Sequence, residues 1–170
     1  MSNFNLKELF NLSGEILTRL DKGAFLTTKG QGKNNTMIIS WGAIGEIWGK
    51  PMMMIMVRKS RYTHDLLENS RDFTVTFAEG DALKEAWKVS GSQSGHQIDK
   101  FTQLGLTAKD SKAVAAPIID TDALQLECKI FYKTDIDAKG MKEADYQEFY
   151  ADGDIHTLYF AEILEAYETK

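Results

Sequence analysis

The sequence is poor in cysteine and proline and has no long apolar run. Cys128 is the only cysteine among 170 residues, which excludes an internal disulfide, a CxxC pair and an iron–sulfur ligand set. Pro51 and Pro117 are the only prolines, and without a linker or an internal repeat we expect one domain over residues 1–170. The run "PMMMIMV" is too short to span a bilayer, and the N-terminus is polar throughout, so we expect neither an anchor nor a signal peptide.

Positive charge is also in deficit, since 20 Lys and Arg face 25 Asp and Glu for a net charge of −5. A non-specific nucleic-acid partner needs a basic face, so we expect none, and we expect no membrane partner and a cytoplasmic location. The charge is nevertheless unevenly distributed. Cations dominate the segment from Lys29 to Arg61, and acidic residues dominate the segment from Asp135 to the end.

Most of the chain reads as strands. "NNTMIISW" places Met37, Ile39 and Trp41 on one face, "DALQLECKIFYKTDID" is a long amphipathic strand, and "IHTLYFAEILEAYE" is the last. Helical spacing of apolar residues predicts one or two short helices up to about Leu20, one that opens on Asp81 and ends before Gly91, and one in 94–105. Many strands with few, short helices predict a mainly β fold, an antiparallel barrel with appended helices.

The basic residues gather at the start of a predicted helix. "RKSRYTHDLLEN" reads as a strand end, then Ser60 as a helix N-cap, then a helix. A helix start exposes unpaired N–H groups, and Arg58 and Arg61 add charged donors, so this pattern favours a phosphate. The alternative is a solvated surface with Ser60 as a simple cap. Neither a P-loop nor a dinucleotide GxGxxG motif is present.

Six segments, in order and over nearly the whole chain, carry a family resemblance. They are "KGAFLTT" (22–28), "NTMIISWGAIGEIWGKPMMMIMVRKSRYT" (35–63), "FTVTF" (73–77), "SGSQSGHQIDKFTQLGL" (90–106), "LQLECKIF" (124–131) and "GDIHTLYFAEI" (153–163). Together they resemble the flavin reductase-like, FMN-binding split-barrel family, and within it the flavoredoxin-like branch. The resemblance implies a six-stranded antiparallel Greek-key split β-barrel that forms a homodimer and binds FMN near the subunit interface.

The resemblance also implies roles for particular residues. A strand would lie along the flavin ring and contribute Asn35, Thr36, Met37, Ile38, Ser40 and Trp41. The ribityl chain and phosphate would contact Val57, Arg58, Ser60, Arg61, Tyr62 and Thr63, with Ser94, Gly95 and Lys100 at the phosphate end. His156 would be the catalytic residue near the flavin face, where a nicotinamide or another redox partner approaches.

Two positions depart from the family pattern. His96 and Gln97 stand where relatives often have an arginine, and Ile155 intervenes between Asp154 and His156. One extra residue in a strand would turn the histidine to the opposite face unless a bulge absorbs it.

Other chemistry-bearing residues have simpler interpretations. His64, His96 and His156 lack metal-ligand spacing, so we expect no metal site, and His64 reads as a surface residue. Trp41 and Trp48 either cover the flavin pocket or fill a core or subunit interface, and for Trp48 we favour the interface.

These inferences lead to competing functions. The first is an oxidoreductase of the flavin reductase type, in which NAD(P)H passes hydride to FMN and the flavin passes electrons to a free flavin or another acceptor. The second is a flavoredoxin-like FMN electron-transfer protein without its own nicotinamide site, whose acidic C-terminal third would dock a basic partner. A third is an FMN-binding store or sensor.

Overall fold

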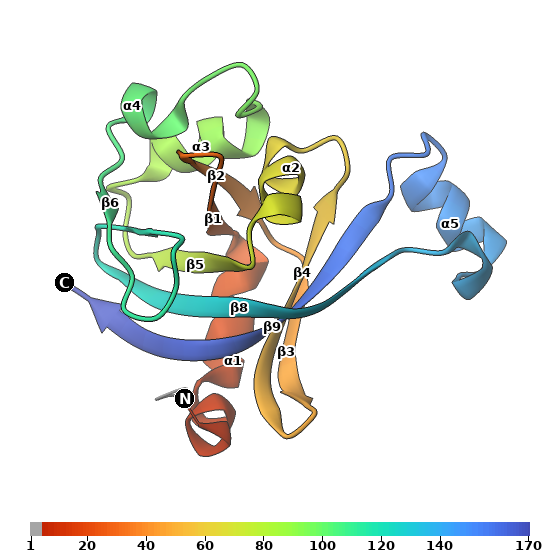
Figure 1. The fold of residues 1–170 in the computed structure, drawn as a ribbon, viewed down its shortest axis with the longest axis horizontal. Coiled ribbons are helices and arrows are strands. Elements are labelled where there is room, and N and C mark those ends of the chain that lie inside the picture. The colour runs from red at the N-terminus through yellow and green to blue at the C-terminus, as the bar shows by residue number, and fades with distance from the viewer. Residues whose placement is uncertain (1–4) are drawn as a thin grey trace.

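The computed structural model describes residues 5–170, which form one main antiparallel sheet with helices around it (Figure 1). The helices are α1 (Leu6–Lys22), α2 (Tyr62–Asn69), α3 (Lys84–Ser92), α4 (Lys100–Leu104) and α5 (Glu143–Tyr150), with the 3-10 helix η1 (Ala138–Gly140). The strands are β1 (Ala24–Gly30), β2 (Lys33–Ile39), β3 (Gly42–Ile47), β4 (Lys50–Arg58), β5 (Asp72–Ala78), β6 (Ala108–Lys109), β7 (Ile118–Ile119), β8 (Ala123–Asp135) and β9 (His156–Thr169).

The main sheet has seven strands in the order β2-β1-β5-β8-β9-β4-β3, and β6 and β7 form a separate pair. The mainly β antiparallel class is therefore as predicted. β2 and β3 follow each other in the chain but stand at opposite ends of the sheet, so in the described part of the chain the sheet does not close between them. The barrel is open along the outer edge of β2.

The main sheet has seven strands, where six were expected for the barrel, and β3 is the strand at one end of it. Gly42, Gly45 and Glu46 give β3 a weak strand propensity, and its pairing with the buried β4 holds it in place. The hairpin between them turns at Trp48 and Gly49, whose φ angles of 56° and 67° suit a tight two-residue turn.

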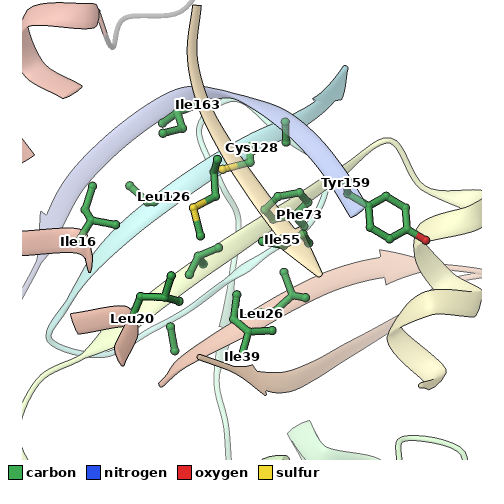
Figure 2. Close-up of a cluster of buried hydrophobic side chains, with 14 of the residues drawn as sticks. Ile16, Leu20, Leu26, Ile39, Ile55, Phe73, Leu126, Cys128, Tyr159 and Ile163 are labelled. Atoms are coloured by element: carbon green, nitrogen blue, oxygen red, sulfur yellow. The ribbon is translucent and has the colours of Figure 1, made fainter. Parts of the chain in front are cut away.

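The core lies between α1 and the concave side of the sheet. Asn5 caps α1 and forms a capping box with Glu8, and the helix then buries Leu9, Ile16 and Leu20 on one face. Figure 2 shows side chains from α1 meeting side chains from several strands of the sheet. Its labelled residues are Ile16, Leu20, Leu26, Ile39, Ile55, Phe73, Leu126, Cys128, Tyr159 and Ile163.

The N-terminal helix is confirmed, but three helix boundaries differ from the sequence prediction. α3 begins at Lys84 rather than at Asp81, with no side-chain cap. Only Lys100–Leu104 is helical in the segment 94–105, because Asp99 caps α4 and the residues before it form turns. Arg61, not Ser60, is the N-cap of α2.

Three helices lie close to β2, and one lies far from it. α2, α3 and α4 all contact β2, whereas α5 sits at the far end of the extended β8 and β9 (Figure 1). The sequence analysis did not predict α5, whose apolar residues show little helical periodicity. No helix within residues 5–170 is long and apolar enough to cross a membrane.

Leu67 anchors α2, the helix whose N-terminus carries Arg61, and is 2% exposed. We expect Leu67→Ala to lower the free energy of unfolding by about 2–5 kcal/mol, because it leaves a cavity under α2. Leu17→Ala in α1 is the matched control, since Leu17 is 46% exposed, and it should change stability by less than about 0.5 kcal/mol. Urea denaturation measures both, and equal effects would contradict the packing described for α2.

Candidate functional site

Two adjoining cavities lie beside the open edge of β2. The first, the Trp41 cavity, is lined by Met37, Ile38, Ile39, Ser40, Trp41, Met56, Arg58, Arg61 and His156. The second, the Lys100 cavity, is lined by Asn35, Met37, Ile38, Arg61, Tyr62, Thr63, Ser90, Gly91, Gln93, Ser94, Gly95 and Lys100. Met37, Ile38 and Arg61 line both, so the two cavities form one continuous groove. Most of the predicted site residues meet there, although they come from distant parts of the chain.

Lys100 is a buried ammonium group that ties three elements together. It is 3% exposed, and its Nζ donates to the carbonyl oxygens of Thr36 at 2.8 Å and Ser90 at 3.0 Å. α4 is thereby linked to β2 and to α3. Burial, and then the charge of Arg61, lower the pKa of Lys100 to about 8. Lys100 therefore shapes the cavity as well as lining it.

The two predicted arginines have different surroundings. Arg58 donates to the carbonyl oxygens of Asp154 at 2.6 Å and Phe149 at 2.9 Å, and it lies 3.6 Å from Asp152. Arg61 is exposed at the start of α2, and within residues 5–170 its guanidinium forms no hydrogen bond or ion pair. Arg61 is thus the cation available to an anion in the groove.

Three predicted residues do not line the groove. Thr36 and Val57 are fully buried in the sheet, where Thr36 Oγ1 donates to the Leu26 carbonyl at 3.2 Å. The carbonyl of Thr36 reaches the groove through its bond to Lys100. Ser60 is held by Asp154, whose carboxylate accepts from Ser60 Oγ at 2.6 Å and from its N–H at 3.0 Å.

Ser90 lines the Lys100 cavity but escaped the sequence analysis. It is 2% exposed, and its Oγ has no hydrogen-bond partner in the described structure. A buried hydroxyl without a partner is costly, and a ligand oxygen in the cavity would satisfy it. The serines of "SGSQSG" were the only sequence feature that could have indicated Ser90. Because a helix was predicted there, nothing distinguished Ser90 from its neighbours.

Gly95 closes the cavity at a point where no side chain fits. A Cβ atom at this position would lie 2.2 Å from Asn35 Oδ1 and 2.6 Å from Tyr62 Cδ1. Asn35 in turn donates to Thr63 Oγ1 at 2.8 Å, which fixes both at the wall. The Lys100 cavity therefore offers one guanidinium, the hydroxyls of Thr63 and Ser90 and the first N–H groups of α2, a donor set that fits a phosphate monoester.

His156 faces the Trp41 cavity. The turn at Gly153 and Ile155 precedes β9, which begins only at His156, so the extra residue lies outside the strand. His156 Nδ1 lies 2.9 Å from the hydroxyl of Tyr150, and its ring centroid lies 5.9 Å from that of Trp41. Burial is the main cause that lowers the pKa of His156 to about 4, with Arg58 adding to it, so the imidazole is neutral near pH 7.

His64 was expected at the surface, and that expectation is wrong. Its side chain is only 12% exposed, and Nε2 lies 3.0 Å from the hydroxyl of Thr157. Thr157 also donates to Asp135 at 2.6 Å, so this network fastens α2 to β8 and β9 on the face opposite His156.

The acidic C-terminal third supplies partners to the basic segment. Asp135 pairs with Lys59 at 2.5 Å, Glu162 pairs with Lys50 at 2.7 Å, and Asp152 and Asp154 hold Arg58 and Ser60 as described above. Part of the uneven charge along the chain is therefore balanced by contacts within the fold.

A larger cavity lies elsewhere. It measures about 570 Å³ and includes Phe25, Phe77, Trp87 and Arg19 in its wall. Arg19 is already paired with acidic residues, at 2.5 Å from Glu15. Size alone does not define a functional site, and the groove beside β2 is the place where donors without partners converge.

Comparison with known proteins agrees with this arrangement. Residues 22–170 match the model of the flavin reductase like domain. The chain belongs to this family. Over 140 residues it is 31% identical to an uncharacterized protein of Archaeoglobus fulgidus, covering 82% of this chain and 68% of that protein.

Two solved structures of this fold are also similar. The flavoredoxin from Methanosarcina acetivorans has a TM-score of 0.69 at 22% identity, over 87% of this chain and 68% of that one. The NADH:FAD oxidoreductase SgcE6 of Streptomyces globisporus has a TM-score of 0.65 at 19% identity, over 86% and 74%. These similarities confirm the family and the split-barrel fold expected from the sequence.

The buried Lys100 predicts a pH dependence of stability. Its pKa is about 8 when folded and 10.5 when unfolded, so between these values the unfolded chain binds more protons and stability rises with pH. We expect wild-type protein to gain on the order of 2 kcal/mol relative to Lys100→Met between pH 8 and pH 10. Urea denaturation at several pH values measures this, with the exposed Lys88→Met as control. Parallel pH profiles for wild type and Lys100→Met would contradict the burial of the charge.

Proposed function

We propose that the chain, as one domain, binds FMN in the groove beside β2 and is an oxidoreductase of the flavin reductase type. It would take electrons from NAD(P)H and pass them to a flavin or another acceptor. The observation that carries this proposal is the continuity of the Trp41 and Lys100 cavities, with the rings of Trp41 and the neutral His156 in the first, Ser90 and Lys100 in the second, and Arg61 in the wall of both. A bound flavin supplies the hydride-accepting chemistry itself.

The two ends of the groove suit the two ends of such a ligand. Arg61, Thr63 and Ser90 would bind the phosphate, with Tyr62, Ser94 and Gly95 at the same end. Asn35, Met37, Ile38, Ser40 and Trp41, and the backbone of Thr36, would follow the ribityl chain and the ring. Val57 and Ser60 would support the flavin site indirectly, through the residues beside them. Lys100 would support it by holding the wall of the cavity together.

His156 would hold a proton at the ring end. Because Tyr150 is its only side-chain hydrogen-bond partner in the described structure, the phenol can donate to Nδ1 and leave Nε2–H directed to the groove. A neutral N–H donor can stabilise negative charge that develops on a ring without carrying a charge itself. Arg58 would contribute by fixing the segment that carries Tyr150 rather than by binding phosphate.

The reductase is preferred to the pure electron carrier for a structural reason. The carrier hypothesis used the acidic C-terminal third as a docking patch, and several of those carboxylates are paired with Lys50, Lys59 and Arg58.

The test of this function is reduction of the bound flavin by a nicotinamide. Purified protein is loaded with FMN and mixed with NADH, and separately with NADPH, without oxygen. We expect the flavin absorbance at about 450 nm, typical of the oxidised cofactor, to bleach faster than the same absorbance of free FMN. Bleaching by a ferredoxin-type donor alone would favour the carrier, and FMN binding with no reduction by either would favour a store or sensor.

We further propose that the protein is a homodimer. Trp48, Phe131 and Tyr132 form an aromatic surface and are 50–56% exposed. The rings of Trp48 and Phe131 are 4.9 Å apart. Exposed aromatic groups of this kind are typical of protein interfaces. Light scattering should give twice the chain's mass, and a monomeric mass at micromolar concentration would contradict the proposal.

The phosphate assignment predicts the behaviour of Arg61→Ala. Loss of one charged hydrogen bond should weaken FMN binding by about 1.5–3 kcal/mol. Riboflavin lacks the phosphate, so its affinity should stay within about twofold, on the order of 0.4 kcal/mol. Fluorescence titration measures both ligands, and Arg71→Ala, beyond the other end of α2, is the matched control. An equal loss for both flavins would contradict the assignment of Arg61.

A further inference from the structure

The cavity beside Trp87 has no part in the groove described above. This Trp87 cavity measures about 570 Å³, a volume in the range of small-molecule sites. Its wall comes from the end of α1, the start of β1, the end of β5 and the start of α3. It shares no lining residue with the Trp41 cavity or the Lys100 cavity. A ligand bound there would therefore be separate from any ligand in the groove.

An exposed indole supplies an aromatic surface in this cavity. Trp87 is 40% exposed, and the almost fully buried Phe25 and Phe77 line the cavity with it. The indole lies against Gly23, where a Cβ atom would be 2.8 Å from Trp87 Cζ2 and 3.0 Å from Nε1. Gly23 also has a φ angle of 97°, which favours glycine. The indole is thus seated on a position that leaves room for no side chain, and a flat aromatic ligand would pack against it.

Arg19 holds another part of the wall together without a ligand. Its guanidinium pairs with Glu15 at 2.5 Å, Glu79 at 3.1 Å and Glu168 at 3.3 Å. These contacts join α1 to β9 and to the segment that follows β5. Because the charges of Arg19 and Glu79 are used by each other, these residues shape the cavity but offer little to a ligand.

Two lysines are the cations left for a ligand. Lys22 is exposed at the end of α1, and within residues 5–170 its ammonium group forms no hydrogen bond or ion pair. Lys84 lies 3.9 Å from Asp81, and these side chains are 79% and 89% exposed, so the pair is weak. Lys22 and Lys84 against Asp81 leave one positive charge in excess. That charge suits a carboxylate rather than a phosphate, which carries nearly two negative charges.

α3 stands between the Trp87 cavity and the groove. Lys84 and Trp87 line the Trp87 cavity, whereas Ser90 and Gly91, one turn further along α3, line the Lys100 cavity. Both places can therefore be occupied at the same time.

We propose that the Trp87 cavity binds a small aromatic carboxylate. The ring of this ligand packs against Trp87, and its carboxylate lies between the ammonium groups of Lys22 and Lys84. The inference does not depend on the proposed flavin site.

The experiment follows the indole N–H signals of the isotope-labelled full-length chain by NMR while 2-naphthoate is added. The three tryptophans report three places, with Trp41 in the groove, Trp48 on the exposed aromatic surface and Trp87 in this cavity. Substituting each by phenylalanine in turn assigns the signals. We expect the Trp87 signal alone to shift, with a dissociation constant of about 0.1–1 mM, ordinary for a ligand of this size. Saturating FMN should leave that constant within about twofold, because uncoupled sites bind independently.

Charge variants test the position of the carboxylate. Lys22→Gln should weaken 2-naphthoate binding about threefold, the scale of one exposed charge pair. Adding Lys84→Gln to it should weaken binding about tenfold in all. Lys7→Gln, also exposed on α1, is the matched control and should leave the affinity unchanged. The ligand control is 2-naphthylmethylammonium, which has the same ring and the opposite charge and should bind at least about fivefold more weakly.

Three results would overturn the inference. The first is an unshifted Trp87 signal up to about 10 mM 2-naphthoate, beyond the weakest affinity expected. The second is a shift of the Trp41 signal in its place, which would put 2-naphthoate in the groove. The third is an affinity that neither the lysine variants nor the charge of the ligand changes. FMN binding is measured separately, so each of these results leaves the proposed function as it stands.

Discussion

The open edge of β2 is the constraint on which the site depends. β2 pairs with β1 on one side only, so the backbone groups of its other edge need partners from outside the sheet. Lys100 provides one of them by donating to the carbonyl of Thr36, and the same ammonium holds the carbonyl of Ser90. The groove exists because α3 and α4 are held beside this edge without covering it.

Joining three elements through a buried lysine is unfavourable in free energy, and local hydrogen bonds explain why the lysine is there. Burial disfavours the charge, as the lowered pKa shows, yet two carbonyl acceptors partly compensate it. An apolar side chain at position 100 would fill the space but leave the carbonyls of Thr36 and Ser90 without this donor. The arrangement also places a positive charge behind the cavity where a phosphate is proposed.

The class of fold and most residues that line the groove could be predicted from the sequence, and the differences between prediction and structure share one cause. Ser60 and Arg58 were assigned to a phosphate from their closeness in the chain to Arg61, but both are used by the segment that precedes β9. That segment is over 90 positions from Arg58 and Ser60 in the chain, and no local sequence pattern indicates the contact. Ser90 was missed for the same reason, since only tertiary packing leaves its hydroxyl buried and without a partner.

The family motifs pointed to His156, which lines the Trp41 cavity, because such motifs carry long-range information that periodicity lacks. Even so, the extra Ile155 raised a question of register that only the structure answers, because the additional residue lies in the turn at Gly153 before the strand begins. The contact of Tyr150 with His156 also depends on α5, a helix with little apolar periodicity to reveal it.

The two arginines of the groove are used differently. Arg58 donates to backbone carbonyls of the segment carrying Tyr150, and together with burial its charge keeps His156 neutral. Arg61 has no side-chain partner in the described structure and lines both cavities. Two joined cavities, with the rings of Trp41 and His156 in one and Arg61 in the wall of both, suit a ligand with a flat uncharged ring and an anionic tail. This complementarity in charge, more than cavity size, is what distinguishes the groove from the larger cavity beside Trp87.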